Sequence, residues 1–80
     1  MKYFCYLITD EEVMEFKGEL SAIPPGFIEY EATLSGLNVY YRIMNGKITE
    51  VIAEAFDEQI ARERVENFLA TFIVTPFEPL

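Results

Sequence analysis

The chain has no histidine and no tryptophan, and it has a single cysteine. Without histidine it lacks the most common metal ligand and general base, so a zinc site or an imidazole-activated serine or cysteine cannot be built. Cys5 alone cannot form an intramolecular disulfide, and its apolar neighbours indicate a core thiol. We therefore predict no metal, no cofactor and no catalytic residue.

Cations and long apolar runs are also scarce. Fourteen Asp and Glu residues stand against six Lys and Arg residues, which gives a net charge of −8. The cations are scattered, so we expect no direct binding to nucleic acid or to an anionic membrane. No apolar run approaches the roughly 20 residues of a membrane span, and the apolar start MKYFCYLI is followed by charged residues where a signal peptide needs small ones. These features predict a cytoplasmic protein.

Hydrophobic residues make up 51% of the 80 residues, which favours a folded chain despite its charge. A chain of this length is too short for two cores, so we predict a single compact α+β domain over residues 1–80. It is also short enough to bury only about 60–65% of its unfolded surface. Association into a homodimer is therefore an alternative source of stability.

The N-terminal third predicts a strand followed by a helix. Apolar residues occupy both alternating sets over residues 2–8, as in a strand covered on both faces. Thr9 and Glu12 then fit the T-x-x-E capping box of a helix start. Helical spacing follows at Val13, Phe16 and Leu20. This pattern predicts a helix over residues 10–20, before a loop at Pro24-Pro25-Gly26.

Two turn signals predict a three-strand meander over residues 27–34, 37–44 and 47–56. Asn45-Gly46 is a strong two-residue hairpin signal, because a type I′ turn needs positive φ at both positions, and Ser35-Gly36 is a weaker one. Counting cross-strand partners through two-residue turns puts one apolar set on the inner face. The predicted inner pairs are Ile28 with Ile43, Tyr30 with Tyr41, Ala32 with Val39 and Leu34 with Leu37.

The same count puts Glu29 opposite Arg42 and Glu31 opposite Tyr40 on the outer face. It also puts Glu50 on the inner face, opposite Tyr41. An inward carboxylate there has two interpretations: a polar group at the end of a helix-sheet pocket, or a structural charge that blocks edge pairing or is turned away by a β-bulge.

A second helix is predicted over residues 58–72, with Asp57 as its N-cap and Glu58 and Arg62 as an i, i+4 ion pair. Its apolar stripe consists of Ala61, Val65, Phe68, Leu69 and Phe72. The predicted order is β-α-β-β-β-α. This is an α+β fold in which a three-strand antiparallel meander joins an N-terminal strand, and both helices pack on one sheet face.

Acidic residues dominate the expected surface. Asp10, Glu11 and Glu12 fit the first turn of the predicted helix, where carboxylates interact favourably with the helix dipole. Glu15 and Glu19 extend Glu11 into an i, i+4, i+8 row, which is either a solvated face or a surface for a cationic partner.

The predicted outer sheet face adds two acids and a tyrosine, a residue type enriched at interfaces. The predicted partner-binding residues are Glu11, Glu12, Glu15, Glu19, Glu29, Glu31 and Tyr40.

Three functions follow from these patterns. The first is a small non-enzymatic protein-binding module, an inhibitor or regulator whose carboxylates stand where phosphates would be in the basic groove of a partner protein. Compact acidic proteins of this size act in this way in phages and mobile elements against host defence, anti-CRISPR proteins among them. The alternatives are a small-molecule-binding or enzymatic domain with a pocket around Glu50 and Tyr41, and a homodimeric structural subunit that buries the outer sheet face.

Overall fold

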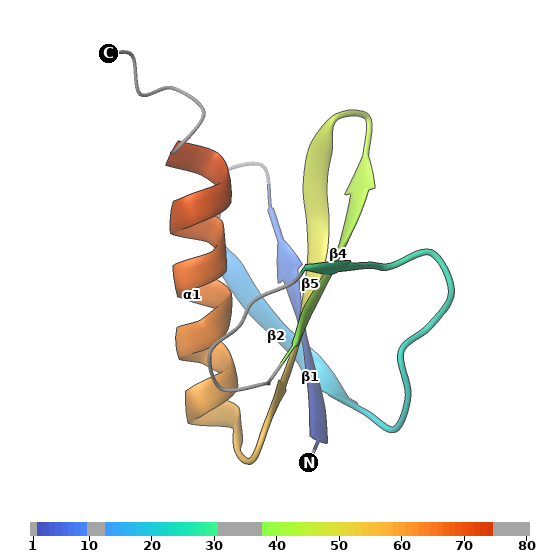
Figure 1. Ribbon diagram of the computed structural model, residues 1–80, viewed down its shortest axis with the longest axis vertical. Helices are drawn as coiled ribbons and strands as arrows, with labels where there is room; N and C mark the ends of the chain where they lie inside the picture. Colours follow the sequence, from blue (N-terminus) through green and yellow to red (C-terminus); the bar gives the residue numbers. More distant parts are fainter. Residues whose placement is uncertain (1, 10–12, 31–37, 75–80) are drawn as a thin grey trace.

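The computed structural model describes residues 2–9, 13–30 and 38–74, which form one antiparallel sheet and one helix (Figure 1). The elements are β1 (Lys2–Ile8), β2 (Met14–Leu20), β3 (Ile28–Tyr30), β4 (Val39–Met44), β5 (Lys47–Ala55) and α1 (Glu58–Val74). The strands lie in the order β2-β1-β5-β4-β3, and every neighbouring pair is antiparallel. Within these residue ranges, no helix is long and apolar enough to cross a membrane.

The main core lies between α1 and the middle of the sheet. The helix packs over β5 and contacts β1 and β4 on either side of it. The buried core residues are Phe4, Tyr6, Val39, Val51, Ala53 and Ala55 from the sheet, and Ala61, Val65, Phe68 and Leu69 from the helix. The predicted strand over residues 2–8 and the predicted C-terminal helix are thus both confirmed.

The start of α1 also follows its sequence signal. The backbone N–H of Ile60 donates to Asp57 Oδ1 at 3.0 Å, so Asp57 is the N-cap. Arg62 Nε lies 3.6 Å from Glu58 Oε2, which confirms the predicted i, i+4 pair. The helix continues to Val74, two residues beyond the predicted end. The side chain of Phe72 and the residues after Val74 lie outside the described part of the chain.

The predicted helix over residues 10–20 is wrong, because Met14–Leu20 is strand β2. Met14 and Phe16 pair with Ile8 and Tyr6 of β1 and face the same side of the sheet as α1. Thr9 does not begin a helix. Its backbone N–H donates to the Val13 carbonyl at 3.1 Å, and its hydroxyl oxygen accepts from the Val13 N–H at 3.2 Å. Glu12, the other half of the capping box, lies outside the described residues.

A β-bulge explains why the spacing of β2 resembles that of a helix. The register with β1 shifts between Cys5 and Tyr6, so that Phe16 pairs with Tyr6 and Gly18 pairs with Cys5. Lys17 is the extra residue. Gly18 has φ of 151°, a backbone conformation that side chains rarely adopt. Because of the extra residue, the side chains at positions 14 and 16 face one side of the sheet and the side chain at position 20 faces the other. The apolar positions 16 and 20 are thus four residues apart, a spacing that a helix also satisfies.

The meander is confirmed at its second turn and corrected in its register. Asn45 has φ of 53° and Gly46 has φ of 80°, as a type I′ turn requires. The observed β3–β4 pairs are Ile28 with Tyr41, Glu29 with Tyr40 and Tyr30 with Val39. The predicted partners of Ile28, Glu29 and Tyr30 were Ile43, Arg42 and Tyr41, each wrong by two residues. The predicted partner of Val39, Ala32, was wrong by the same shift. A shift of two keeps each side chain on its face, so Tyr30 and Tyr41 still pack against the core. Tyr40 pairs with Glu29, so its predicted pairing with Glu31 was wrong by the same shift, and the predicted pair of Leu34 with Leu37 lies outside the described part.

The sheet face away from α1 is also covered in part. β2 and β3 are opposite edges, and the segment that connects them, residues 21–27, runs on the side of the sheet away from the helix (Figure 1). The Arg42 guanidinium lies over the Phe27 ring, 4.6 Å from its centroid. Cys5 and Ile52 point to this face and are 2% and 0% exposed. We refer to it below as the open face, although its centre is buried.

Candidate functional site

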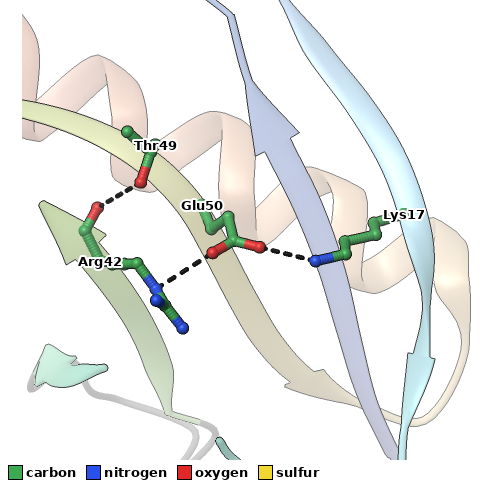
Figure 2. Close-up of polar contacts among 4 residues, drawn as sticks. All are labelled: Lys17, Arg42, Thr49 and Glu50. Carbon is green, nitrogen blue, oxygen red and sulfur yellow. Dashed lines mark hydrogen bonds and ion pairs between the residues drawn. The ribbon is translucent and has the colours of Figure 1, made fainter. Parts of the chain in front are cut away.

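Three charged side chains meet on the open face, each from a different strand (Figure 2). Glu50 of β5 lies between Lys17 of β2 and Arg42 of β4. Lys17 Nζ is 2.9 Å from Glu50 Oε2, and Arg42 Nε is 3.1 Å from Glu50 Oε1. The Glu50 side chain is only 14% exposed, whereas those of Lys17 and Arg42 are 51% and 34% exposed. The cluster therefore ties β2 to β5 across the intervening strand β1.

Two irregularities in the sheet bring this cluster together. The bulge in β2 frees Lys17 from direct pairing and lets its side chain reach Glu50. A second register shift, between Arg42 and Ile43, places Glu50 opposite Arg42 and leaves Tyr41 opposite Val51 on the helix side. The prediction that Glu50 faces Tyr41 on the inner face was therefore wrong, because the bulge turns Glu50 to the other side of the sheet.

The cluster has the character of a structural clamp. Each carboxylate oxygen of Glu50 already faces a cation, and the Thr49 hydroxyl donates to the Arg42 carbonyl at 3.4 Å (Figure 2). Cys5 lies beneath it on the same face, and burial together with the charge of Glu50 raises the pKa of its thiol. A raised pKa disfavours the nucleophilic thiolate, which agrees with the expectation of a core thiol.

We expect Glu50→Gln to lower the free energy of unfolding by about 1–2 kcal/mol, because it leaves two cations facing a neutral amide. The partial exposure of both cations keeps the loss below that of a fully buried pair. Urea unfolding at pH 7 measures it. Glu54→Gln is the matched control: Glu54 lies on the same strand and face, with no ion pair among the described residues, and should change the free energy by less than about 0.5 kcal/mol. Equal losses in both variants would contradict the clamp.

A second polar group joins the sheet to the start of α1. The hydroxyl of Tyr6, which is fully buried, donates a short hydrogen bond to the Glu58 carboxylate and lies 3.3 Å from the Glu58 carbonyl oxygen. The Arg62 guanidinium lies 5.7 Å from the centre of the Tyr6 ring. Burial, followed by the hydrogen bond and the negative charge of Glu58, raises the pKa of the Tyr6 hydroxyl far above its ordinary value. This group holds the helix on β1, and its buried hydroxyl is out of reach of a substrate.

The raised pKa of Tyr6 predicts a loss of stability in alkali. Tyrosine in an unfolded chain ionises near pH 10, whereas Tyr6 in the folded chain stays protonated well above that pH, so its contribution is complete below about pH 10 and is lost as the pH rises further. Tyr6→Phe should cost about 1 kcal/mol at pH 7 and should lose less stability than the natural chain between pH 9 and pH 11. Urea unfolding across this range compares the two. Parallel pH profiles would show that Tyr6 does not carry the effect.

The structure separates the predicted partner-binding residues into two groups. Glu15 and Glu19 are exposed on the β2 edge of the sheet, and Lys2 Nζ lies 3.7 Å from Glu19 Oε2. Glu29 is exposed on β3 at the opposite edge, where its carboxylate accepts from Asn38 Nδ2 at 2.7 Å. Tyr40 is half-buried on the open face, edge-on to Tyr3 with ring centroids 6.3 Å apart. The remaining three, Glu11, Glu12 and Glu31, lie outside the described residues.

The β2 edge exposes apolar side chains that the prediction had placed in the apolar stripe of a helix. Val13 and Phe16 are 53% and 43% exposed, although Phe16 also packs beside Tyr6 with ring centroids 5.3 Å apart. Between β2 and α1 lies an open groove of about 340 Å³, lined by Met14, Arg62, Glu66 and Leu69. Strand alternation at positions 14 and 16 was the one sequence signal for this surface. This alternation can be recognised only once β2 is known to be a strand.

Comparison of the chain with protein-family models, with curated proteins and with solved structures gave no match. The candidate site therefore has to be interpreted from its own geometry. The two polar clusters hold elements of the fold together, and the β2 edge with its groove combines exposed apolar side chains with exposed carboxylates.

Proposed function

We propose that this chain is a small acidic, non-enzymatic protein-binding module that engages a partner protein through the β2 edge of its sheet. The observation that carries the proposal is the combination on one strand of the exposed side chains of Phe16, Glu15 and Glu19, next to the groove beside α1. An apolar centre with charged residues around it is the usual composition of a protein interface.

Charge supports a cationic partner. The net charge of −8 creates a negative field that steers basic surfaces toward the chain and raises their association rate at low ionic strength. Of the two carboxylates on β2, Glu15 has no ion pair among the described residues, and the pair of Glu19 with Lys2 is exposed and long, at 3.7 Å. Such a pair contributes little and is easily exchanged for a partner's cation.

In its more specific form, the proposal is that the partner is a nucleic-acid-binding protein and that the carboxylates occupy positions of phosphates in its basic groove. This would make the chain an inhibitor or regulator of the kind that phages and mobile elements direct against host defence, such as an anti-CRISPR protein. The acidic composition and the small size support this form, and identification of the partner tests it.

Affinity capture from the native host tests the proposal. The tagged chain is used at about 0.1 M and 0.5 M NaCl, with and without nuclease, and the bound proteins are identified. We expect a basic, nucleic-acid-binding protein that persists after nuclease treatment, is lost at high salt, and is displaced by added DNA or RNA. Recovery of the chain only as a stable dimer, with no second protein, would contradict the proposal and favour the homodimeric alternative.

A further inference from the structure

Strand β2 forms one edge of the sheet, and the groove between the sheet and α1 meets this strand at Met14. Among residues 2–9, 13–30 and 38–74, no other strand pairs with β2 on its outer side. An edge strand presents unpaired backbone N–H and C=O groups along its length, which an extended chain can satisfy by adding a strand. β3 is the other edge, but it has only three residues, against seven in β2. The longer edge offers a longer row of backbone groups.

The two sides of β2 differ in chemistry, and this difference defines the side chains of an added strand. On the helix side, Met14 lines the groove together with Leu69, and Phe16 faces the same side of the sheet two residues along β2. On the open-face side, Glu15 is exposed opposite Leu7. An added strand places alternate side chains on the two sides, so apolar residues would enter the groove while the residues between them would meet Glu15.

Charge complementarity selects among occupants. Glu66 stands at the groove, while Arg62 is already paired with Glu58 at 3.6 Å. Lys17, the cation on β2, is held by Glu50 at 2.9 Å, and this bond and the charge of Glu50 raise its pKa. The free charges around the edge are therefore negative. A second copy of the chain would add a further net charge of −8, which opposes pairing of β2 with itself.

We propose that the β2 edge binds, by strand addition, an extended segment of a partner protein in which apolar residues alternate with lysine or arginine. The apolar residues lie against Met14 and Leu69 in the groove and beside Phe16, and the cations, on the other side of the added strand, meet Glu15. Glu66, at the groove, adds to the negative field there. This inference rests on the proposed function and specifies how the partner is held. It involves no covalent step.

A defined peptide tests the strand addition. The probe is an acetylated and amidated heptapeptide of alternating valine and lysine, titrated into the full ¹⁵N-labelled chain and followed through amide chemical shifts. We expect shifts confined to Met14–Leu20 of β2 and to α1 around Glu66 and Leu69. The same peptide with a central proline, which lacks one backbone N–H and fixes φ at about −65°, should bind at least roughly tenfold more weakly, as should the valine-glutamate peptide.

Charge reversals locate the contact within the edge. Glu15→Lys, which reverses the charge that faces the peptide's cations, should weaken binding of the valine-lysine peptide by roughly tenfold, or about 1.4 kcal/mol. Glu66→Lys, which places a cation in the groove that the apolar residues enter, should weaken it by a similar factor. Glu63→Lys is the matched control, because Glu63 is exposed on the same helix and does not line the groove. It should weaken binding by less than about threefold, through the change in net charge alone.

Several results would overturn the inference. The first is a set of chemical-shift changes confined to β3. The second is binding of the proline and glutamate peptides as tight as that of the valine-lysine peptide, and the third is an equal loss of affinity in all three variants. Shift changes in β2 that depend on protein concentration without peptide would identify a second copy as the occupant. The inference and the proposed function fail in different ways. If the chain captures a basic partner but does not bind the peptide, only the strand addition is contradicted. If it binds the peptide but captures no partner, the proposed function is contradicted.

Discussion

Replacing Phe68 by alanine should lower the free energy of unfolding by about 3–4 kcal/mol, the typical cost of removing a buried aromatic ring. Phe68 is 3% exposed, and its ring lies edge-on to Tyr30 of β3 with centroids 4.9 Å apart. It also packs beside Tyr41 of β4, at 5.4 Å. One side chain of α1 therefore anchors the helix to the two strands at the β3 side of the sheet, and β3 is too short to hold its place alone.

For a domain of this size, such a loss should lower the melting temperature by roughly 12–32 °C. Thermal and urea unfolding both measure it. Phe56→Ala makes the same chemical change at a residue that is 68% exposed, and should alter the free energy of unfolding by less than about 0.5 kcal/mol. If the two variants lose equal stability, α1 does not pack on the sheet as described.

The second large effect concerns binding. The double variant Glu15→Lys, Glu19→Lys should reduce the affinity for the captured basic partner by about 100-fold at 0.1 M NaCl, or about 2.7 kcal/mol. Both carboxylates are exposed on β2, and their reversal converts attraction into repulsion at the edge that we propose to be the contact surface. The variant should remain folded, because neither side chain is in the core.

A control with the same change in net charge separates the edge from the overall field. Glu29→Lys with Glu63→Lys places two reversals on the opposite edge strand and on the helix. It should reduce affinity by less than about tenfold, through the long-range field. If this control and the β2 variant lose affinity equally, the partner does not select the β2 edge. Glu29 and Tyr40 would then again be candidates for the contact surface, as the sequence predicted.

Local signals predicted part of the fold. Asp57 and the stripe from Ala61 to Leu69 predicted α1, because the N-cap and the helical spacing depend on nearby residues alone. Asn45-Gly46 predicted the β4–β5 turn for the same reason. The division of the β3 and β4 side chains between two faces was also correct, since a register error of two residues keeps every side chain on its side.

The remaining errors come from features that depend on distant residues. The bulge at Lys17 and Gly18 gives β2 a spacing that a helix also satisfies, and only pairing with β1 decides between them. The register shift next to Arg42 reverses the face of Glu50 and creates the Lys17–Glu50–Arg42 cluster. Its ion pairs join residues 33 and 8 positions apart in the sequence, and β2 comes near β5 only because both pair with β1 in the folded sheet.

The candidate surface was less predictable than the fold. Glu15 and Glu19 were predicted to contact a partner, and their exposure on β2 is compatible with that role. The groove beside Met14 and Leu69 could not be predicted, because it depends on where α1 crosses the sheet. The predicted acidic row along a helix is replaced by two carboxylates on an edge strand, which favours recognition of an extended segment.

Amide hydrogen exchange of the chain, free and in complex with the captured partner, tests the central claim most directly. We predict slower exchange in the complex for the outward N–H groups of Met14–Leu20 and for the Arg62–Leu69 part of α1, with little change in Ile28–Tyr30. Protection confined to Ile28–Tyr30 and the open face, with β2 exchanging as fast as in the free chain, would contradict the assignment of the β2 edge as the binding surface.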